Sequence, residues 1–291
     1  MKKILVLGFF DSLHKGHRFL FEQAKRFAGD EKEIYITTFD DGFLHAVGRN
    51  DDEIYLLAER KEILQKIGRF NIIVFPSQSE FILKTKEQFC SFLLKLNPTH
   101  IIMGSDYRFG KNAEGDTQFL RDFFNNKGVN VVICDFLTDH GEKISTRTIK
   151  KLLLGGDIVK ANELLVDPFF YEGNVVKGRQ DGRKMGIPTL NISIPFGKIK
   201  IKSGVYVTRT EIGDKKFLSV TNVGSHPTFG DLSFNVETHL IANEEITIQY
   251  DEKIRVYFYQ FIREIVNFRT KDDLIKQIEN DKKFAKEVLH D

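Results

Sequence analysis

The chain has 291 residues, of which 41% are hydrophobic and 29% are charged, and its formal net charge is +2. This length allows two domains with cores of their own, and the near balance of charge excludes the basic surface typical of nucleic-acid-binding proteins. Two cysteines are too few for a disulfide framework, and no apolar run reaches the length of a membrane span. We therefore expect a soluble cytoplasmic protein with no nucleic-acid or membrane partner.

Short apolar strands alternate with amphipathic helices through the first half of the chain. We expect strands at residues 4–7, 33–39, 71–75, 100–103 and 129–134, and helices at 17–27, 54–67, 89–96 and 117–125. This alternation predicts a doubly wound parallel sheet with helices on both faces. Ligands of such sheets bind beyond the carboxyl ends of the strands, so the segments that follow the strands are the candidate site.

Three of these segments carry polar side chains that suit a nucleotide. The first, His14-Lys15-Gly16-His17, places two imidazoles at a helix N-terminus, where free N–H groups and the helix dipole favour phosphate. Residues 104–111 and 144–150 add aspartate, arginine, lysine and hydroxyl groups. Taken alone, the histidine segment is more typical of a surface turn than of a site, and the alternatives for the other two are an ordinary turn and a helix cap. Because all three follow strands of one parallel sheet, together they predict a single nucleotide site.

The pattern changes after about residue 158. Strands without intervening helices are expected at residues 169–176, 204–210, 217–223, 234–240, 246–250 and 254–261, followed by a helix at 271–289. Strands in this order predict a small antiparallel barrel or sandwich. We therefore divide the chain into domains of residues 1–158 and 159–291.

A glycine-rich segment of the second half suits a phosphate chain. Gly178, Gly182 and Gly186 recur at every fourth position and free the backbone to wrap phosphates. Thr189 and Asn191 follow, and alternate residues of an extended segment point the same way. Their oxygens are ligands that Mg²⁺ accepts when ATP phosphates and water complete its shell. The alternative is an ordinary glycine-rich loop between strands.

A second segment, residues 234–240, carries Glu237 and His239 on one face of an apolar strand. A carboxylate is costly to bury without a task. As a general base, Glu237 could take the proton of a primary hydroxyl that attacks the γ-phosphate of ATP. The alternative is a solvent-facing pair on an edge strand.

These motifs together resemble a known family. The His-Lys-Gly-His turn and residues 104–110 and 144–150 are similar to the nucleotidyltransferase half of prokaryotic bifunctional FAD synthetases, the riboflavin kinase/FMN adenylyltransferases. Residues 186–191 and Glu237-Thr238-His239 are similar to the riboflavin kinase half. The resemblance implies a Rossmann-like nucleotidyltransferase domain followed by a six-stranded riboflavin kinase barrel with a C-terminal helix. It implies that riboflavin and ATP give FMN, and that FMN and ATP then give FAD and pyrophosphate.

The resemblance also implies roles for individual residues. Glu237 would be the base for phosphorylation, and His14 and His17 would bind ATP phosphates and stabilise the transition state of adenylylation. Thr189 and Asn191 would hold Mg²⁺. The nucleotide and phosphate contacts implied are Phe10, Asp11, Ser145, Thr146, Lys150, Gly178, Gly182, Gly186, Thr189 and Asn191. The flavin contacts implied are Asp106, Arg108, Phe109 and Arg263.

The chain departs from the family pattern at several positions of the first half. Phe9 and Ser12 stand where the family usually has asparagine and glycine, and Thr146 and Lys150 stand for serine and arginine. Lysine keeps the charge of arginine but loses its two-pronged donor geometry. Two alternatives therefore stay open, a riboflavin kinase with weak or lost adenylyltransferase activity and a flavin-binding regulatory protein without turnover.

Overall fold

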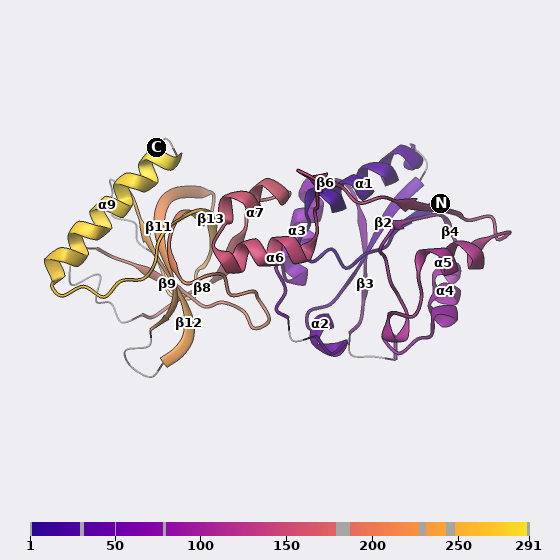
Figure 1. Ribbon diagram of the computed structural model, residues 1–291, viewed down its shortest axis with the longest axis horizontal. Coiled ribbons are helices and arrows are strands. Elements are labelled where there is room, and N and C mark those ends of the chain that lie inside the picture. The colour runs from indigo at the N-terminus through magenta and orange to yellow at the C-terminus, as the bar shows by residue number, and fades with distance from the viewer. Residues whose placement is uncertain are drawn as a thin grey trace. The chain divides into compact units, whose positions relative to one another are not determined.

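The computed structural model describes residues 2–29, 32–49, 51–77, 80–178, 187–226, 231–242 and 248–289. The chain divides into two compact units. The first unit contains Met1–Ile149 and Gly197–Ile199, and the second contains Lys150–Phe196 and Lys200–Asp291. Figure 1 shows a sheet covered by helices in the first unit and a barrel in the second.

The first unit is built on a parallel sheet, as the alternating pattern predicts. Its strand order is β3-β2-β1-β4-β5. The strands are β1 (Lys2–Val6), β2 (Lys32–Phe39), β3 (Asn71–Phe75), β4 (Pro98–Gly104) and β5 (Asn130–Cys134). Ile4, Leu5 and Val6 of the central strand have no exposed surface, because helices cover both faces of a parallel sheet.

The helices of this unit begin where the sequence supplies caps. The side chains of His14, Thr85 and Asp116 accept hydrogen bonds from the first turns of α1, α4 and α5. The helical segments are α1 (Lys15–Ala28), α2 (Phe43–Ala46), α3 (Leu57–Ile67), α4 (Lys86–Lys95), the 3₁₀ turn η1 (Lys111–Ala113) and α5 (Thr117–Phe124). Helix α6 (Thr146–Gly155) begins in this unit, and its residues from Lys150 on belong to the second unit. The short α2 and a small hairpin of β6 (Thr138–Asp139) and β7 (Glu142–Lys143) were not expected from the sequence.

The second unit is a closed antiparallel barrel, which confirms the predicted fold class. The strand order around it is β10-β11-β12-β9-β8-β13. The elements are α7 (Ile158–Leu164), β8 (Phe170–Val176), β9 (Leu190–Ile192), β10 (Gly204–Ile212), β11 (Lys215–His226), β12 (Asp231–Leu240), β13 (Lys253–Arg263) and α9 (Lys271–Leu289). One strand was assigned wrongly, because residues 248–250 are not in a strand and the three-residue β9 closes the barrel instead.

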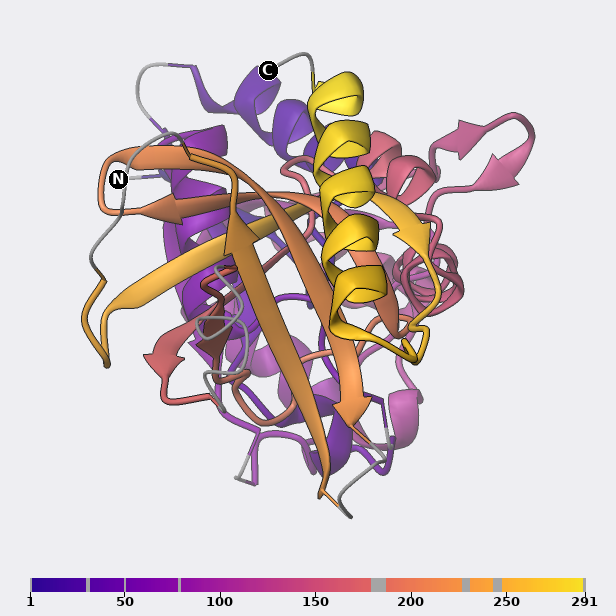
Figure 2. The same cartoon turned by 90° about the vertical axis from the view of Figure 1, so that its left-hand side faces the viewer.

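The C-terminal helix α9 packs on the outer side of the barrel, against β10 and β11 (Figure 2). Its apolar stripe, which includes Ala285 and Phe284, meets Val205, Val207 and Leu218 of these strands.

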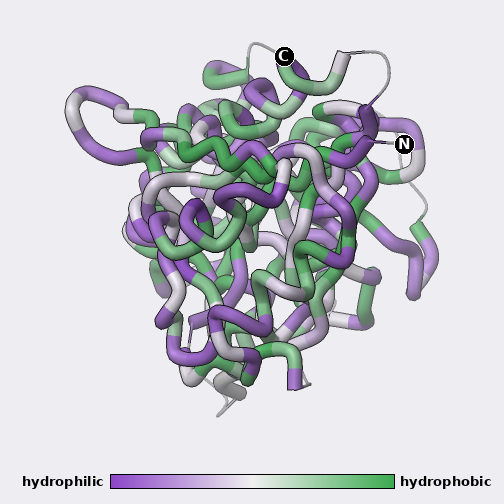
Figure 3. Tube along the Cα trace, turned by 90° about the vertical axis from the view of Figure 1, so that its right-hand side faces the viewer, coloured by the Kyte–Doolittle hydropathy of each residue, from purple (hydrophilic) through white to green (hydrophobic). Residues whose placement is uncertain are grey.

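Figure 3 shows hydrophobic stretches alternating with hydrophilic ones along the trace, as buried strands joined by polar turns require.

A chain of hydroxyl groups crosses the interior of the barrel. Thr208, Thr210, Ser219, Thr221 and Thr238 have no exposed surface, and their oxygens lie 2.7–3.2 Å apart along the chain. Each buried hydroxyl is therefore paired with another, which removes most of the cost of burying it. The network joins β10, β11 and β12, the strand that carries Glu237.

We expect Thr221→Val to destabilise the barrel by about 1–3 kcal/mol, because valine has a similar shape but leaves Thr208 and Thr238 without one partner each. Urea unfolding followed by circular dichroism measures this change. Thr138→Val, at an exposed position, is the control and should leave the midpoint unchanged. An unchanged midpoint for Thr221→Val would contradict a stabilising role of the network.

Candidate functional sites

The connection between β1 and α1 is held in an uncommon backbone conformation. Phe10 and Leu13 have φ angles of 57° and 43°, in the left-handed region that side chains other than glycine rarely adopt. Both side chains are buried, and a Cβ on Gly8 would lie only 2.4 Å from the Phe10 ring. Packing therefore maintains a strained loop directly before the histidines, as is frequent at functional sites.

The two histidines of this loop stack on each other. Their ring centres are 3.6 Å apart and the planes are inclined by 16°. The backbone N–H of His17 donates to Nδ1 of His14 over 3.1 Å, so the neutral His14 ring carries its proton on Nε2. That N–H group is a donor for a ligand oxygen. A Cβ on Gly16 would lie 3.0 Å from the His14 ring, which explains a glycine at this position.

Burial keeps both histidines uncharged near neutral pH. Desolvation lowers the pKa of His14 from 6.5 to about 4, and the nearby charges of Asp106 and Lys143 act on it in opposite directions. Desolvation also lowers the pKa of His17 well below its usual value, and the His14 ring adds to this effect. A polyphosphate would therefore meet neutral hydrogen-bond donors in the free protein.

The other two predicted segments reach the same edge of the sheet. The hydroxyl groups of Ser12 and Thr146 lie 2.9 Å apart, which joins the histidine loop to the start of α6. Ser145 accepts a hydrogen bond from Thr148 N–H, as expected for a cap. Lys143 and Asp106 form an ion pair of 2.5 Å between the β6–β7 hairpin and the loop after β4. The sequence did not single out Ser12 or Lys143 as members of this site.

Some predicted residues of the first unit have other surroundings. Phe109 is 5% exposed and packs in the core against Phe89, with ring centres 5.0 Å apart, so its contact with a ligand stays an untested prediction. Arg108 is exposed and lies 3.7 Å from Asp116. Lys150 lies about one turn after Thr146 on α6.

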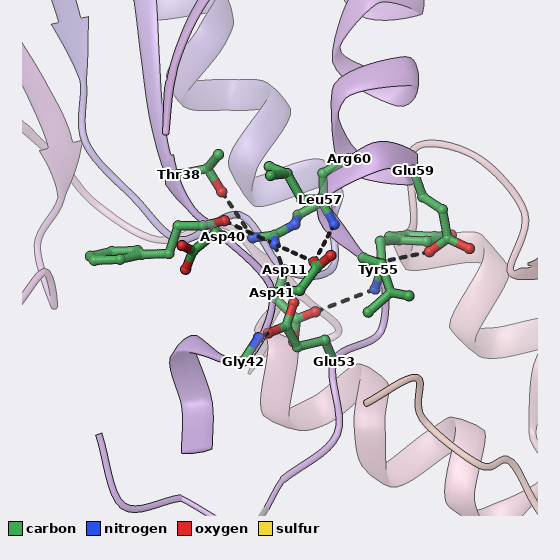
Figure 4. A network of polar contacts seen from close by, with 12 residues as sticks. Asp11, Thr38, Asp40, Asp41, Gly42, Glu53, Tyr55, Leu57, Glu59 and Arg60 are labelled. Carbon is green, nitrogen blue, oxygen red and sulfur yellow. Dashed lines mark hydrogen bonds and ion pairs between the residues drawn. The ribbon is translucent and has the colours of Figure 1, made fainter. Parts of the chain in front are cut away.

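Asp11 is buried beside the histidine loop and holds a second segment there. Its Oδ1 accepts from Ile54 N–H at 2.6 Å and from Tyr55 N–H at 3.3 Å (Figure 4). Asp11 and Phe10, both predicted to contact the nucleotide, are each 2% exposed. Their contacts in the described structure are with the protein itself and hold the loop between β1 and α1 in place.

A cluster of buried charges surrounds this contact, and sequence reasoning missed it. Arg60 has no exposed surface and donates to the carbonyl oxygens of Phe9 and Phe39, to Thr38 and to Glu53. Its guanidinium also lies 4.7 Å from the centre of the Phe9 ring. Burial raises the pKa of Glu53 to about 7, although the charge of Arg60 opposes this shift. No local signal distinguishes these residues from solvent-facing charges of an amphipathic helix.

The second candidate site is a cavity of about 870 Å³ at the barrel. Thr189, Asn191 and Glu237 contribute to its wall, together with residues of the start of α9. The pairing of β9 with β12 places Asn191 opposite Glu237. The structure therefore brings together three residues that the sequence predicted as one centre.

Hydrogen bonds fix these three side chains. Thr189 donates from its hydroxyl to Glu237 Oε1 over 2.5 Å, and Asn235 Nδ2 donates to Asn191 Oδ1 over 2.9 Å. Gly178 lies against the Asn191 amide, where an added Cβ would be only 2.2 Å from Nδ2. Hydroxyl, amide and carboxylate oxygens are the ligands that Mg²⁺ prefers. Among the described residues no group of three or more histidine, cysteine, aspartate or glutamate side chains could hold a metal ion.

The remaining predicted residues are partly placed. Arg263 lines the cavity and pairs through two nitrogens with Asp281, which is 2% exposed. Gly182 and Gly186 lie outside the residues that the structure describes. Asn222, which the sequence did not single out, lies opposite Glu237 on β11 and lines the cavity. Its Oδ1 is buried and has no hydrogen-bond partner within the described part of the chain.

Comparison with protein families matches residues 1–148 to FAD synthetase and residues 165–289 to riboflavin kinase. The chain is 30% identical to the bifunctional riboflavin kinase/FMN adenylyltransferase of Buchnera aphidicola, over 98% of this chain and 93% of that protein. It is 29% identical to the protein so named from Listeria monocytogenes, over 97% and 90%. It is 32% identical to the trifunctional protein RibF/MnmA of Mycoplasmoides gallisepticum, but spans only 40% of that protein's length.

A solved structure from Streptococcus pneumoniae, described as a macrolide-efflux protein, has the same fold. It superposes with a TM-score of 0.87 at 29% identity, and the match covers 98% of this chain and 94% of that chain.

None of the helices in the described ranges is long and apolar enough to cross a membrane.

The buried histidine pair has a consequence that can be measured directly. We expect the ring signals of His14 to titrate with a midpoint near pH 4 instead of 6.5, because burial penalises the charged ring. A pH titration by NMR measures the midpoint, and His14→Ala identifies the signal. A midpoint of 6 or higher would contradict the proposed burial of the ring.

Proposed function

The chain belongs to the bifunctional riboflavin kinase/FMN adenylyltransferase family, and we propose that its two units each perform one reaction. The barrel unit phosphorylates riboflavin with ATP to FMN. The sheet unit transfers the adenylyl group of a second ATP to FMN and gives FAD and pyrophosphate. The observation that carries this proposal is the bonded Thr189–Glu237 pair beside Asn191 in a cavity of the barrel. We also propose that the boundary between the two domains lies at residue 158 and that the protein is cytoplasmic.

In the kinase reaction Glu237 is the general base. Its carboxylate takes the proton of the riboflavin 5′-hydroxyl, whose oxygen forms a bond to the γ-phosphorus of ATP while the bond to ADP breaks. The hydrogen bond from Thr189 orients this carboxylate before substrate binds. The volume of the cavity, about 870 Å³, lies in the range of ordinary ligand pockets.

Thr189 and Asn191 would hold Mg²⁺ in this centre. The hydroxyl and amide oxygens suit a hard cation, and a bound Mg²⁺ would neutralise charge on the phosphates. Asn235 donates to Asn191 Oδ1 and so orients that amide. Gly178 leaves room for the same amide, since any side chain there would overlap it.

In the adenylyltransferase reaction the protein positions reactants and stabilises charge. A phosphate oxygen of FMN attacks the α-phosphorus of ATP, and pyrophosphate leaves. His14 donates from Nε2 to a phosphate oxygen and stabilises the charge that develops on the leaving group. Ser145 and Thr146 at the start of α6 supply further donors, and the helix N-terminus favours the anion.

We expect Glu237→Gln to lower kcat for FMN formation by about 10²–10⁴-fold, because glutamine cannot accept the hydroxyl proton. FAD formation from added FMN should be unchanged in the same variant and serves as its control. The measurement is chromatographic separation of riboflavin, FMN and FAD after incubation with ATP and Mg²⁺. An unchanged rate of FMN formation would exclude Glu237 as the base.

His14→Ala should show the opposite pattern. FAD formation from FMN falls by about 10²–10³-fold through loss of one donor to the transition state, and FMN formation from riboflavin is retained. The same chromatographic assay measures both rates. Wild-type protein that forms FMN but no FAD would instead support a kinase that has lost its adenylyltransferase activity. Wild-type protein that binds flavin and forms neither product would support a regulatory protein.

A further inference from the structure

We propose that Lys198 is a positioning residue for FMN adenylylation, although it follows the barrel strand β9 in sequence. The inference rests on the proposed function of the first unit. Gly197–Ile199 belong to that unit, separated in sequence from its remainder by Lys150–Phe196. The unit therefore depends on three residues from the second half of the chain.

Backbone hydrogen bonds attach this segment to Glu53, four residues before the start of α3. Glu53 N–H donates to the carbonyl oxygen of Gly197 over 2.7 Å, and Ile199 N–H donates to that of Glu53 over 2.8 Å. The two bonds form an isolated parallel bridge between Glu53 and Lys198. Ile199 is 3% exposed, so the attachment is also packed.

The side chain of Lys198 brings its charge into the interior. It is 1% exposed, and its Nζ lies 2.6 Å from Glu59 Oε2, which belongs to a residue only 5% exposed. The ammonium group also lies 4.9 Å from the centre of the Tyr55 ring. Burying an ion pair costs desolvation free energy. Removing only one partner destabilises the protein, because it leaves an uncompensated buried charge. Lys198 is therefore the charged partner on which the buried position of Glu59 depends.

Glu59 in turn fixes the start of α3, from which two contacts reach the histidine loop. Its Oε2 accepts from Leu56 N–H at 2.8 Å, which holds the first turn of the helix. Arg60, the next residue, donates to the carbonyl oxygen of Phe9 over 3.2 Å. Figure 4 shows Asp11, Tyr55, Glu59 and Arg60 gathered at this point.

The second contact runs through the backbone before the helix. Ile54 and Tyr55 donate to Asp11, three residues before His14. Loss of the Lys198 charge would move Glu59 toward water and shift the segment that carries both contacts. A displacement of about 1 Å in a catalytic group can lower a rate by about 10²-fold. The ground-state contacts of ATP with other segments would persist. We therefore expect a large fall in kcat and only a small change in KM.

The test uses the full chain with Lys198→Met, which keeps an unbranched side chain only one heavy atom shorter and removes the charge. We expect kcat for FAD formation to fall by about 10–100-fold, with KM for ATP within about threefold of wild type. The rate of FMN formation should stay within about twofold of wild type, because neither Lys198 nor Glu59 lines the cavity of the barrel. Lys200→Met, two residues on at an exposed position, is the matched control and should change neither rate.

A double variant separates positioning by charge from general damage. Glu59→Gln combined with Lys198→Met removes both charges of this ion pair, leaves neither partner uncompensated and should recover most of the lost kcat. An unchanged kcat for Lys198→Met, or an equal loss of both activities, would overturn the inference. If Lys198→Met is insoluble, the double variant is tested in its place. A loss of kcat greater than 100-fold in the double variant would also overturn the inference.

A further measurement distinguishes failure of this inference from failure of the proposed function. If the wild-type chain forms no FAD, the proposed function of the first unit fails, and NMR of His14 still reports the loop. Lys198→Met should then shift the His14 ring signals and Lys200→Met should not. Identical spectra for wild type and Lys198→Met would overturn the inference.

Discussion

The first unit depends on neutralising charge that is buried beside the loop between β1 and α1. Arg60 has no exposed surface, and the loop carbonyl of Phe9 receives hydrogen bonds from both Arg60 and Thr38. Hydrogen bonds at both terminal nitrogens of Arg60 offset part of the cost of burying its charge. The same partners fix the backbone that carries Phe10 and Leu13 in their strained conformations. The cost of burying charge thus gives the loop a single arrangement, which a site that works by positioning requires.

In the proposed reactions, the two units bind phosphate by different physical means. The sheet unit would use a helix N-terminus and neutral imidazoles that burial keeps uncharged. The barrel unit uses oxygen ligands and a carboxylate, whose arrangement follows from the register of β9 and β12. Because side chains alternate along an extended segment, Thr189 and Asn191 lie on the same side, and the register places Asn191 opposite Glu237. A hydroxyl chain inside the barrel supports the strand that carries the base.

Most of the fold follows from local patterns in the sequence. Apolar runs such as residues 4–7 identify the parallel strands, and the loss of helical periodicity after residue 158 identifies the barrel. The short strand β9 was missed because three residues give too weak a pattern, and its neighbouring glycines favour a loop. The strand expected at 246–250 was wrong for residues 248–250, where an apolar and polar alternation does not pair with a neighbour.

The candidate sites were predictable only where their residues form compact motifs. The histidine turn, Thr189, Asn191 and Glu237 fall into this class. Lys198 and Glu59 do not, because they are 139 positions apart and each resembles a solvent-facing charge. Asn222 and Lys143 were missed for a similar reason, since only the fold shows what stands opposite them. Non-local pairing of charges is the information that periodicity and spacing do not contain.

The membership of Gly197–Ile199 in the first unit limits how modular this protein can be. A chimaera made by exchanging everything after residue 158 with a homologue would replace Lys198 while retaining Glu59. The donor chain would have to bring a compatible cation at the same depth, or the recipient sheet unit would inherit an orphaned carboxylate. Genetic fission of the two activities into separate chains would meet the same obstacle, so selection on one activity constrains a short stretch of sequence that lies among the residues of the other.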